Sequence, residues 1–113
     1  MTAYQFGEVV LVPFPYTDQS TAKQRPAVVV SSTRYHAERP DLILMAITSQ
    51  QRSEPAIGEL AVRSWQAAGL LKPSAIKPIL TTLEQRLVRR RLGLLDDNDR
   101  AALRQSLALI LGP

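Results

Sequence analysis

Short apolar runs separated by polar, proline-containing stretches make up most of this sequence. The clearest runs lie within residues 8–15, 27–32 and 42–48 and are rich in Val, Leu and Ile. Branched side chains of this kind favour strands over helices, and proline opposes both a helix interior and a central place in a sheet. The pattern therefore restricts most of the chain to short strands joined by irregular loops.

The segments around these runs give weaker predictions. Residues 34–41 favour a loop or one helical turn, residues 57–63 a strand and residues 64–69 a short helical turn. Residues 72–80 predict extended structure, and residues 81–92 fit a strand or a helix equally well.

The end of the sequence has a helical pattern. Leu and Ile recur at helical spacing from residue 103 to residue 111. Asp96 or Asp97 can cap the start of this helix, and Asp99 suits the positive end of its dipole. We therefore expect a mainly β chain with a C-terminal helix (α+β), as a small, curved antiparallel sheet or barrel with the helix packed against it. The length of 113 residues fits one domain over residues 1–113.

Composition narrows the chemistry. Lys and Arg number 14 against 10 Asp and Glu, which gives a net charge of +4 and permits a polyanionic partner. There is no cysteine and a single histidine, which excludes thiol chemistry and disulfides and disfavours a histidine metal site. No apolar run reaches the roughly 18 residues of a membrane helix, and the N-terminus lacks a signal-peptide pattern, so we expect a cytoplasmic protein.

A basic block lies near the end of the predicted sheet. Arg86, Arg89, Arg90 and Arg91 are followed at once by acidic residues. The block is either the solvated end of two elements or one edge of a groove that attracts phosphate. No glycine-rich phosphate loop and no spaced carboxylate pair accompanies it.

His36 lies in a polar segment. We interpret it as an exposed surface histidine, with a catalytic role as the alternative.

Arg25 lies where a polar loop, residues 16–26, meets a valine-rich strand. Pro26 biases the preceding residue toward extended backbone. A guanidinium fixed there can offer its planar fork of donors to a phosphate, and the alternative is a rim charge in a surface ion pair.

Thr48 and Ser49 lie at the end of the most apolar run. Hydroxyls at this place can contact a ligand or cap a turn.

Taken together, five segments resemble the MazF/PemK family of toxin endoribonucleases. They read GEVVLVPFP at residues 7–15, KQRPAVVVS at 23–31, MAITS at 45–49, LKPSAIK at 71–77 and LLDD at 94–97. The likeness covers essentially the whole chain, in the expected order, and includes the closing helix.

The resemblance implies an SH3-like barrel of the plasmid-maintenance toxin type that forms a homodimer. It implies sequence-preferring cleavage of single-stranded RNA, including mRNA, with no metal and no cofactor. It also implies growth inhibition that a cognate antitoxin protein neutralises, and it implies no membrane partner.

The catalytic residues of the family fall on Arg25 and Thr48, with Ser49 as a weaker candidate. Many members carry Glu five residues before this arginine, where this chain has Ser20. Asp18 is the nearest acid and a candidate substitute. Asp18, Ser20 and Ser49 are therefore supporting candidates.

Bases splayed out of a single strand would be read by stacking and edge contacts, and phosphates by cations. The candidate RNA contacts are Phe14, Tyr16, Lys23, Tyr35, Lys77 and Arg86. The aromatic residues have packing as their alternative, and Trp65 is interpreted as a core or dimer-interface residue.

Three rival interpretations stay open at this point. The same barrel occurs in relatives that poison gyrase by binding it and cut nothing. A non-catalytic nucleic-acid-binding module and a toxin that has lost its activity are the other two.

Overall fold

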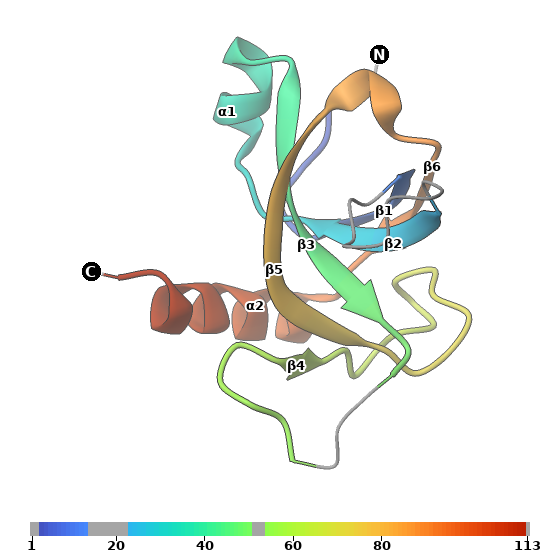
Figure 1. Cartoon of the computed structure of the whole chain (residues 1–113), viewed down its shortest axis with the longest axis vertical. Coiled ribbons are helices and arrows are strands. Elements are labelled where there is room, and N and C mark those ends of the chain that lie inside the picture. The colour runs from blue at the N-terminus through green and yellow to red at the C-terminus, as the bar shows by residue number, and fades with distance from the viewer. Residues whose placement is uncertain (1–2, 14–22, 51–53, 113) are drawn as a thin grey trace.

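A curled antiparallel sheet forms most of the molecule. The computed structural model describes residues 3–13, 23–50 and 54–112, and within them six strands follow the order β4-β5-β3-β2-β1-β6 (Figure 1). The strands are β1 (Glu8–Pro13), β2 (Gln24–Val29), β3 (Asp41–Thr48), β4 (Leu60–Ala61), β5 (Ala75–Glu84) and β6 (Arg90–Leu94). The helices are α1 (Thr33–Glu38), the single 3-10 turn η1 (Gln85–Leu87) and α2 (Asp97–Ile110). The prediction of a mainly β chain with a C-terminal helix is confirmed, with the sheet curled into part of a barrel.

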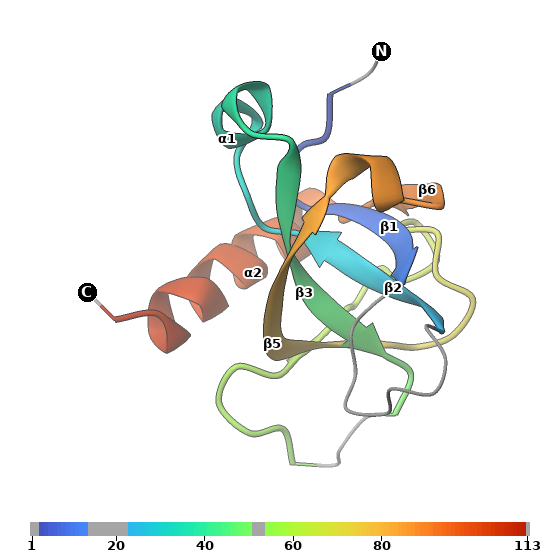
Figure 2. The same cartoon turned by 45° about the horizontal axis from the view of Figure 1, so that its top comes forward.

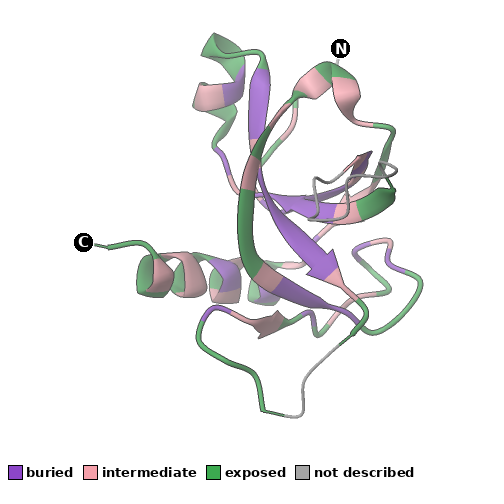
Figure 3. Cartoon of the chain, in the orientation of Figure 1, coloured by how far each residue is buried: buried purple, intermediate pink, exposed green. Residues whose placement is uncertain are grey.

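Both faces of the sheet are buried, which explains why the apolar runs are continuous. Successive strand residues point to opposite faces. Val9 and Met45 belong to the cluster that includes Leu103 of α2, whereas their neighbours Val10 and Leu44 belong to a second cluster. Figure 3 shows the buried residues concentrated on β1, β2 and β3.

The two ends of the molecule carry different elements. Figure 1 shows α2 lying across the sheet near β4, while α1 and η1 lie at the other end, and Figure 2 shows α1 and η1 together in the upper part of the turned molecule. Asp96 is the cap of α2, because its side chain accepts a hydrogen bond from the backbone N–H of Asp99.

The strand predicted over residues 57–63 is mostly absent, since only Leu60 and Ala61 pair with β5. Gly58 has a φ of +93°, and the Glu59 N–H donates to the carbonyl of Ala56, so a turn occupies the first half of this segment.

The undecided segment 81–92 is divided between three elements. β5 runs on to Glu84, η1 makes one turn, and β6 begins at Arg90. β5 passes through Pro78 because the register with β3 shifts between Met45 and Ile47, opposite that proline, which has no N–H to donate.

The prediction of an exposed His36 is wrong. Residues 33–38 form the six-residue helix α1, which turns His36 inward to 8% exposure. Its Nδ1–H donates to the Tyr4 carbonyl at 3.0 Å. Its Nε2 accepts from the Ser31 hydroxyl at 2.5 Å, and that hydroxyl oxygen also accepts from the Ile43 N–H. Both ring nitrogens of His36 are therefore satisfied within the fold.

Candidate active site

A pocket of about 620 Å³ opens where several strand ends meet. It lies between the start of β2, the end of β3, the first half of β5, the segment 69–72 and β6. It is lined by Leu11, Arg25, Pro26, Ala46, Ile47, Thr48, Ser49, Gln50, Gly69, Leu70, Leu71, Lys72, Ser74, Lys77, Ile79, Arg90 and Leu92. Arg25, Thr48, Ser49 and Lys77, all predicted from the sequence, are therefore brought together.

Arg25 is the second residue of β2 and is opposite Val12 of β1. The strand holds its backbone, while its side chain is exposed at the pocket. The sequence predicted a strand from residue 27, whereas β2 begins at Gln24, so Arg25 lies within the strand; residues 16–22 of the predicted loop lie outside the described residues. A guanidinium on such a fixed backbone can present two parallel donors to a phosphate.

Thr48 ends β3 and is opposite Ala75 of β5. Its hydroxyl oxygen accepts a hydrogen bond from the N–H of Gln50 at 3.1 Å. The two alternatives for Thr48 are therefore compatible: the oxygen caps a turn, and the hydroxyl proton remains a donor for a ligand. Ser49 lies next to it and also lines the pocket.

Lys77 reaches the pocket from β5. Its Nζ lies 2.7 Å from Oε2 of Glu59, in an ion pair whose side chains are 25% and 10% exposed respectively. The pairing follows from the register of the antiparallel β4–β5 ladder. Leu60 is opposite Ile76, so Glu59, one residue before Leu60, faces Lys77, one residue after Ile76.

Two cations at the pocket were not selected as site residues from the sequence. Lys72 lies within the LKPSAIK segment and Arg90 within the basic block, so both stood in motifs already noted. None of the described residues that line the pocket is acidic or a histidine. Four cationic side chains line the pocket, and Glu59 behind the lining offsets part of the charge of Lys77. The positive charge that remains favours an anion.

Contacts at residues 63–64 and at Gly69 hold in place the wall formed by residues 69–72. Asp99, buried in α2, accepts hydrogen bonds from the backbone N–H groups of Arg63 at 3.1 Å and Ser64 at 2.9 Å. Gly69 has a φ of +84°, and a Cβ there would overlap the Leu92 carbonyl oxygen. Glycine is required at this close approach of the segment to β6.

Asp96 adds to this anchor. A hydrogen bond from the Ser64 side chain, followed by the backbone N–H of Asp99, lowers the pKa of the Asp96 carboxyl. The start of α2 thus holds the turn that leads into the pocket wall.

Several predicted residues lie elsewhere. Phe14, Tyr16, Asp18 and Ser20 lie outside the described residues. Lys23 is exposed, directly before β2, and is not among the lining residues.

Two further candidates lie at the other end of the molecule. The Tyr35 hydroxyl donates to Asp41 at 3.2 Å. Arg86 pairs with Glu84 at 2.5 Å and lines a second pocket of about 1040 Å³. Trp65 is half-buried against the α2-side cluster, consistent with a core role.

The curled sheet, its C-terminal helix and a cationic pocket at the strand ends define a class of small SH3-like proteins. Sequence comparison makes the assignment specific, because a family model described as "PemK-like, MazF-like toxin of type II toxin-antitoxin system" matches residues 5–111. The chain belongs to this family.

Solved structures share the fold. A mycobacterial endoribonuclease in complex with its cognate antitoxin has a TM-score of 0.77 and 17% identity, covering 98% of this chain and 100% of its own. MazF from Deinococcus radiodurans has a TM-score of 0.75 and 21% identity, covering 100% of both chains. The Mycobacterium tuberculosis toxin MazF-mt6 has a TM-score of 0.73 and 17% identity, covering 90% of this chain and 93% of its own. No curated protein matches the sequence significantly.

No helix among the described residues has the length and apolar character to cross a membrane.

Proposed function

We propose that this protein is an endoribonuclease toxin that cleaves single-stranded RNA, including mRNA, at preferred sequences and without a metal or cofactor. One observation carries this function: Arg25 and Thr48, distant in sequence, line the same cationic pocket. Membership of the toxin family supports it, as do structural neighbours that are endoribonucleases.

The chemistry uses the RNA's own 2′-hydroxyl. Its oxygen attacks the adjacent phosphorus, the bond to the 5′-oxygen breaks, and the products are a 2′,3′-cyclic phosphate and a 5′-hydroxyl end. Arg25 binds the phosphoryl oxygens and stabilises the charge that grows on them. Thr48, with its oxygen fixed by Gln50, donates to a phosphoryl oxygen or orients the 2′-hydroxyl.

Protons must leave the 2′-hydroxyl and reach the 5′-oxygen. Arginine stays protonated in proteins, so Arg25 is not assigned as the base. The described lining contains no carboxylate or histidine. In this proposal a water molecule or Asp18, the two candidates from the sequence, takes the proton from the 2′-hydroxyl, and a water molecule supplies the proton that the departing 5′-oxygen gains.

The walls suit an unpaired nucleotide. Lys72, Lys77 and Arg90 can contact phosphates on either side of the scissile bond. Leu71, which is 93% exposed, and Ile79 offer apolar surface to a base. Phe14, Tyr16 and Lys23 stay candidates for flanking contacts.

The same function implies the partners. A toxin that cuts RNA acts in the cytoplasm, inhibits growth and requires a cognate antitoxin to neutralise it. We propose that the protein forms a homodimer and binds a cognate antitoxin. The structural neighbour solved in complex with its antitoxin supports the antitoxin partner.

The test is cleavage of a long RNA by the purified protein in excess EDTA. We expect discrete cuts with 2′,3′-cyclic phosphate ends. A 2′-O-methyl group next to a mapped cut should block it, because the nucleophile is then absent. Uncut RNA at high protein concentration would contradict the proposal.

The pocket without a lining acid also fits a non-catalytic binder. In that case the protein retains the RNA in a salt-dependent complex and releases no products. The same incubation separates the two functions.

A further inference from the structure

We infer that Glu59 is a positioning residue, which holds the Lys77 ammonium in the pocket for a phosphate of the bound RNA. This role rests on the endoribonuclease function proposed above. Glu59 belongs to none of the sequence motifs and lies outside the basic block. It directly precedes the two-residue strand β4 and does not itself line the pocket.

The geometry of the pair is specific. Oε2 of Glu59 is 2.7 Å from Nζ of Lys77, and Oε1 accepts the N–H of Ala56 at 3.0 Å. One carboxylate therefore closes the 56–59 turn and fixes the lysine. With the Glu59 side chain 10% exposed, the pair is poorly screened by solvent, unlike the surface pair of Arg34 and Glu38 at 90% and 68%.

The pair has two opposing effects on a bound phosphate. A lysine side chain has several rotatable bonds, so an anchor reduces the freedom that must be lost when the ammonium meets a phosphate. The same carboxylate offsets part of the lysine's charge and weakens long-range attraction of RNA. Positioning of the ammonium raises the rate of the chemical step, whereas partial neutralisation of its charge lowers the affinity for RNA. Removal of the carboxylate should therefore lower kcat without weakening RNA binding.

The informative variant is Glu59→Gln. Its amide oxygen can still accept from Ala56, which preserves the turn, but its NH₂ group no longer attracts Lys77. We expect kcat to fall on the order of tenfold or more, since misplaced groups lose much of their catalytic effect. We expect KM to stay equal or fall, because the pocket becomes more positive. Binding of a 2′-O-methyl oligonucleotide should become steeper in salt by up to about 0.7 in log–log slope.

A double-mutant cycle shows whether Glu59 acts through Lys77. In a Lys77→Met background, Glu59→Gln should cause no further loss of kcat. Lys77→Ala, which also removes the cation that Glu59 holds, provides a second background if Lys77→Met folds poorly. Glu38→Gln, which breaks the exposed pair on α1, is the matched control and should change neither parameter.

The outcomes are distinct. If the wild type does not cleave RNA, the proposed function fails, and the salt slopes of the uncleavable oligonucleotide still test the charge offset. If the wild type cleaves and Glu59→Gln matches its kcat with only a lower Tm, Glu59 is structural and the inference is overturned. Additive losses in the cycle would overturn it as well.

Discussion

Two pockets at opposite ends of this molecule both carry arginines, but their charges are arranged differently. The smaller one holds Arg25, Lys72, Lys77 and Arg90, and no acid among the described residues that line it. The larger one combines three arginines with the acidic side chains of Glu38 and Glu84 in its own walls. Size therefore does not select the candidate site, whereas the balance of charge does.

The arginines of the larger pocket are engaged by carboxylates. Arg39 pairs with Asp41 at 3.4 Å, and Arg91 pairs with Glu8 at 2.8 Å while its guanidinium stacks on Tyr4. The first pair links the end of α1 to the start of β3, and the contacts of Arg91 link β6 to β1 and to Tyr4, so both hold elements of the fold together.

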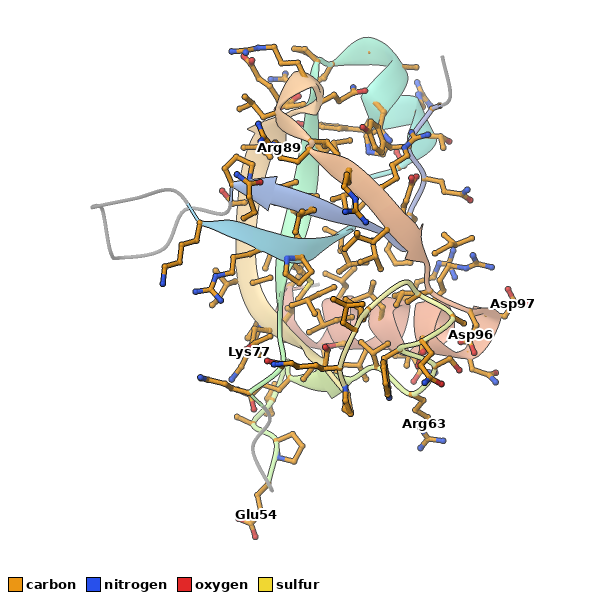
Figure 4. The ribbon with its side chains drawn as sticks, turned by 90° about the vertical axis from the view of Figure 1, so that its right-hand side faces the viewer. Glu54, Arg63, Lys77, Arg89, Asp96 and Asp97 are labelled. Atoms are coloured by element: carbon orange, nitrogen blue, oxygen red, sulfur yellow. The ribbon has the colours of Figure 1, made fainter. Side chains whose placement is uncertain are left out.

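Strand alternation divides the basic block between the two sites. Neighbouring residues of β6 point to opposite sides, and Arg90 lines the first pocket while Arg91 lines the second. Figure 4 shows Arg89 toward the upper end and Lys77 in the lower half of the molecule. The block is therefore not one continuous edge of a groove.

The largest expected effect is the difference in RNA cleavage between the Arg25→Ala and Arg86→Ala variants. Arg25→Ala should reduce kcat/KM for RNA cleavage by about 100-fold to 1000-fold, the usual cost of losing a donor to a developing oxyanion. Arg86→Ala should leave kcat unchanged and raise KM by less than about threefold, as a remote phosphate contact would. Equal losses in the two variants would mean that the two pockets form one functional surface.

Thr48 gives the next effect. Thr48→Ala should lower kcat by about tenfold to 100-fold, because one neutral donor to the phosphoryl group is removed. Thr48→Ser keeps the hydroxyl and should retain most activity. Circular dichroism should show both variants folded, and full activity in Thr48→Ala would leave the hydroxyl with its turn-capping role alone.

Leu71 tests whether the apolar wall reads bases. Leu71→Ala should change the preference among cut sites by less than about tenfold, with total cleavage retained, since one aliphatic contact to a base contributes modestly. Sequencing of the RNA ends measures this change. Leu111→Ala, which removes another exposed leucine beyond α2, is the control and should leave the cut pattern as it is.

The smallest effect concerns stability. The pKa of Asp96 is lowered in the folded chain, so its stabilising contribution is present above the unfolded pKa of about 3.9 and is lost as the pH falls through the lower folded value. Asp96→Asn should lower Tm only slightly at pH 7, because the exposed carboxylate is screened by solvent and Asn can still cap the helix, with kcat unchanged. The difference in Tm should shrink below about pH 4, and a constant difference would argue against ionisation as its cause.

Much of the fold could be predicted because its signals are local. Val28 and Met45 stand in runs apolar on both faces, and Asp96 stands at a helix start. The 57–63 prediction is confirmed only at Leu60 and Ala61, because pairing of that segment depends on β5 and on the turn at Gly58. His36 was misjudged because its partners, Tyr4 and Ser31, lie on other segments.

The candidate site divides in the same way. Arg25 and Thr48 were selected by the motifs around them, at the ends of strands that each could be recognised alone. Lys72, Arg90 and Glu59 were not, because their proximity to the pocket follows from the packing of β4, β5 and β6.

The sequence by itself determined the strands β1, β2 and β3, the closing helix, the family and the two residues proposed for catalysis, because each depends on contiguous residues with their own conformational preferences. The tertiary structure alone decided which cations share a pocket, which are balanced by carboxylates and that Glu59 reaches Lys77. The reason is physical: electrostatic interactions depend on distances in space, and those are set by sheet register and chain curvature.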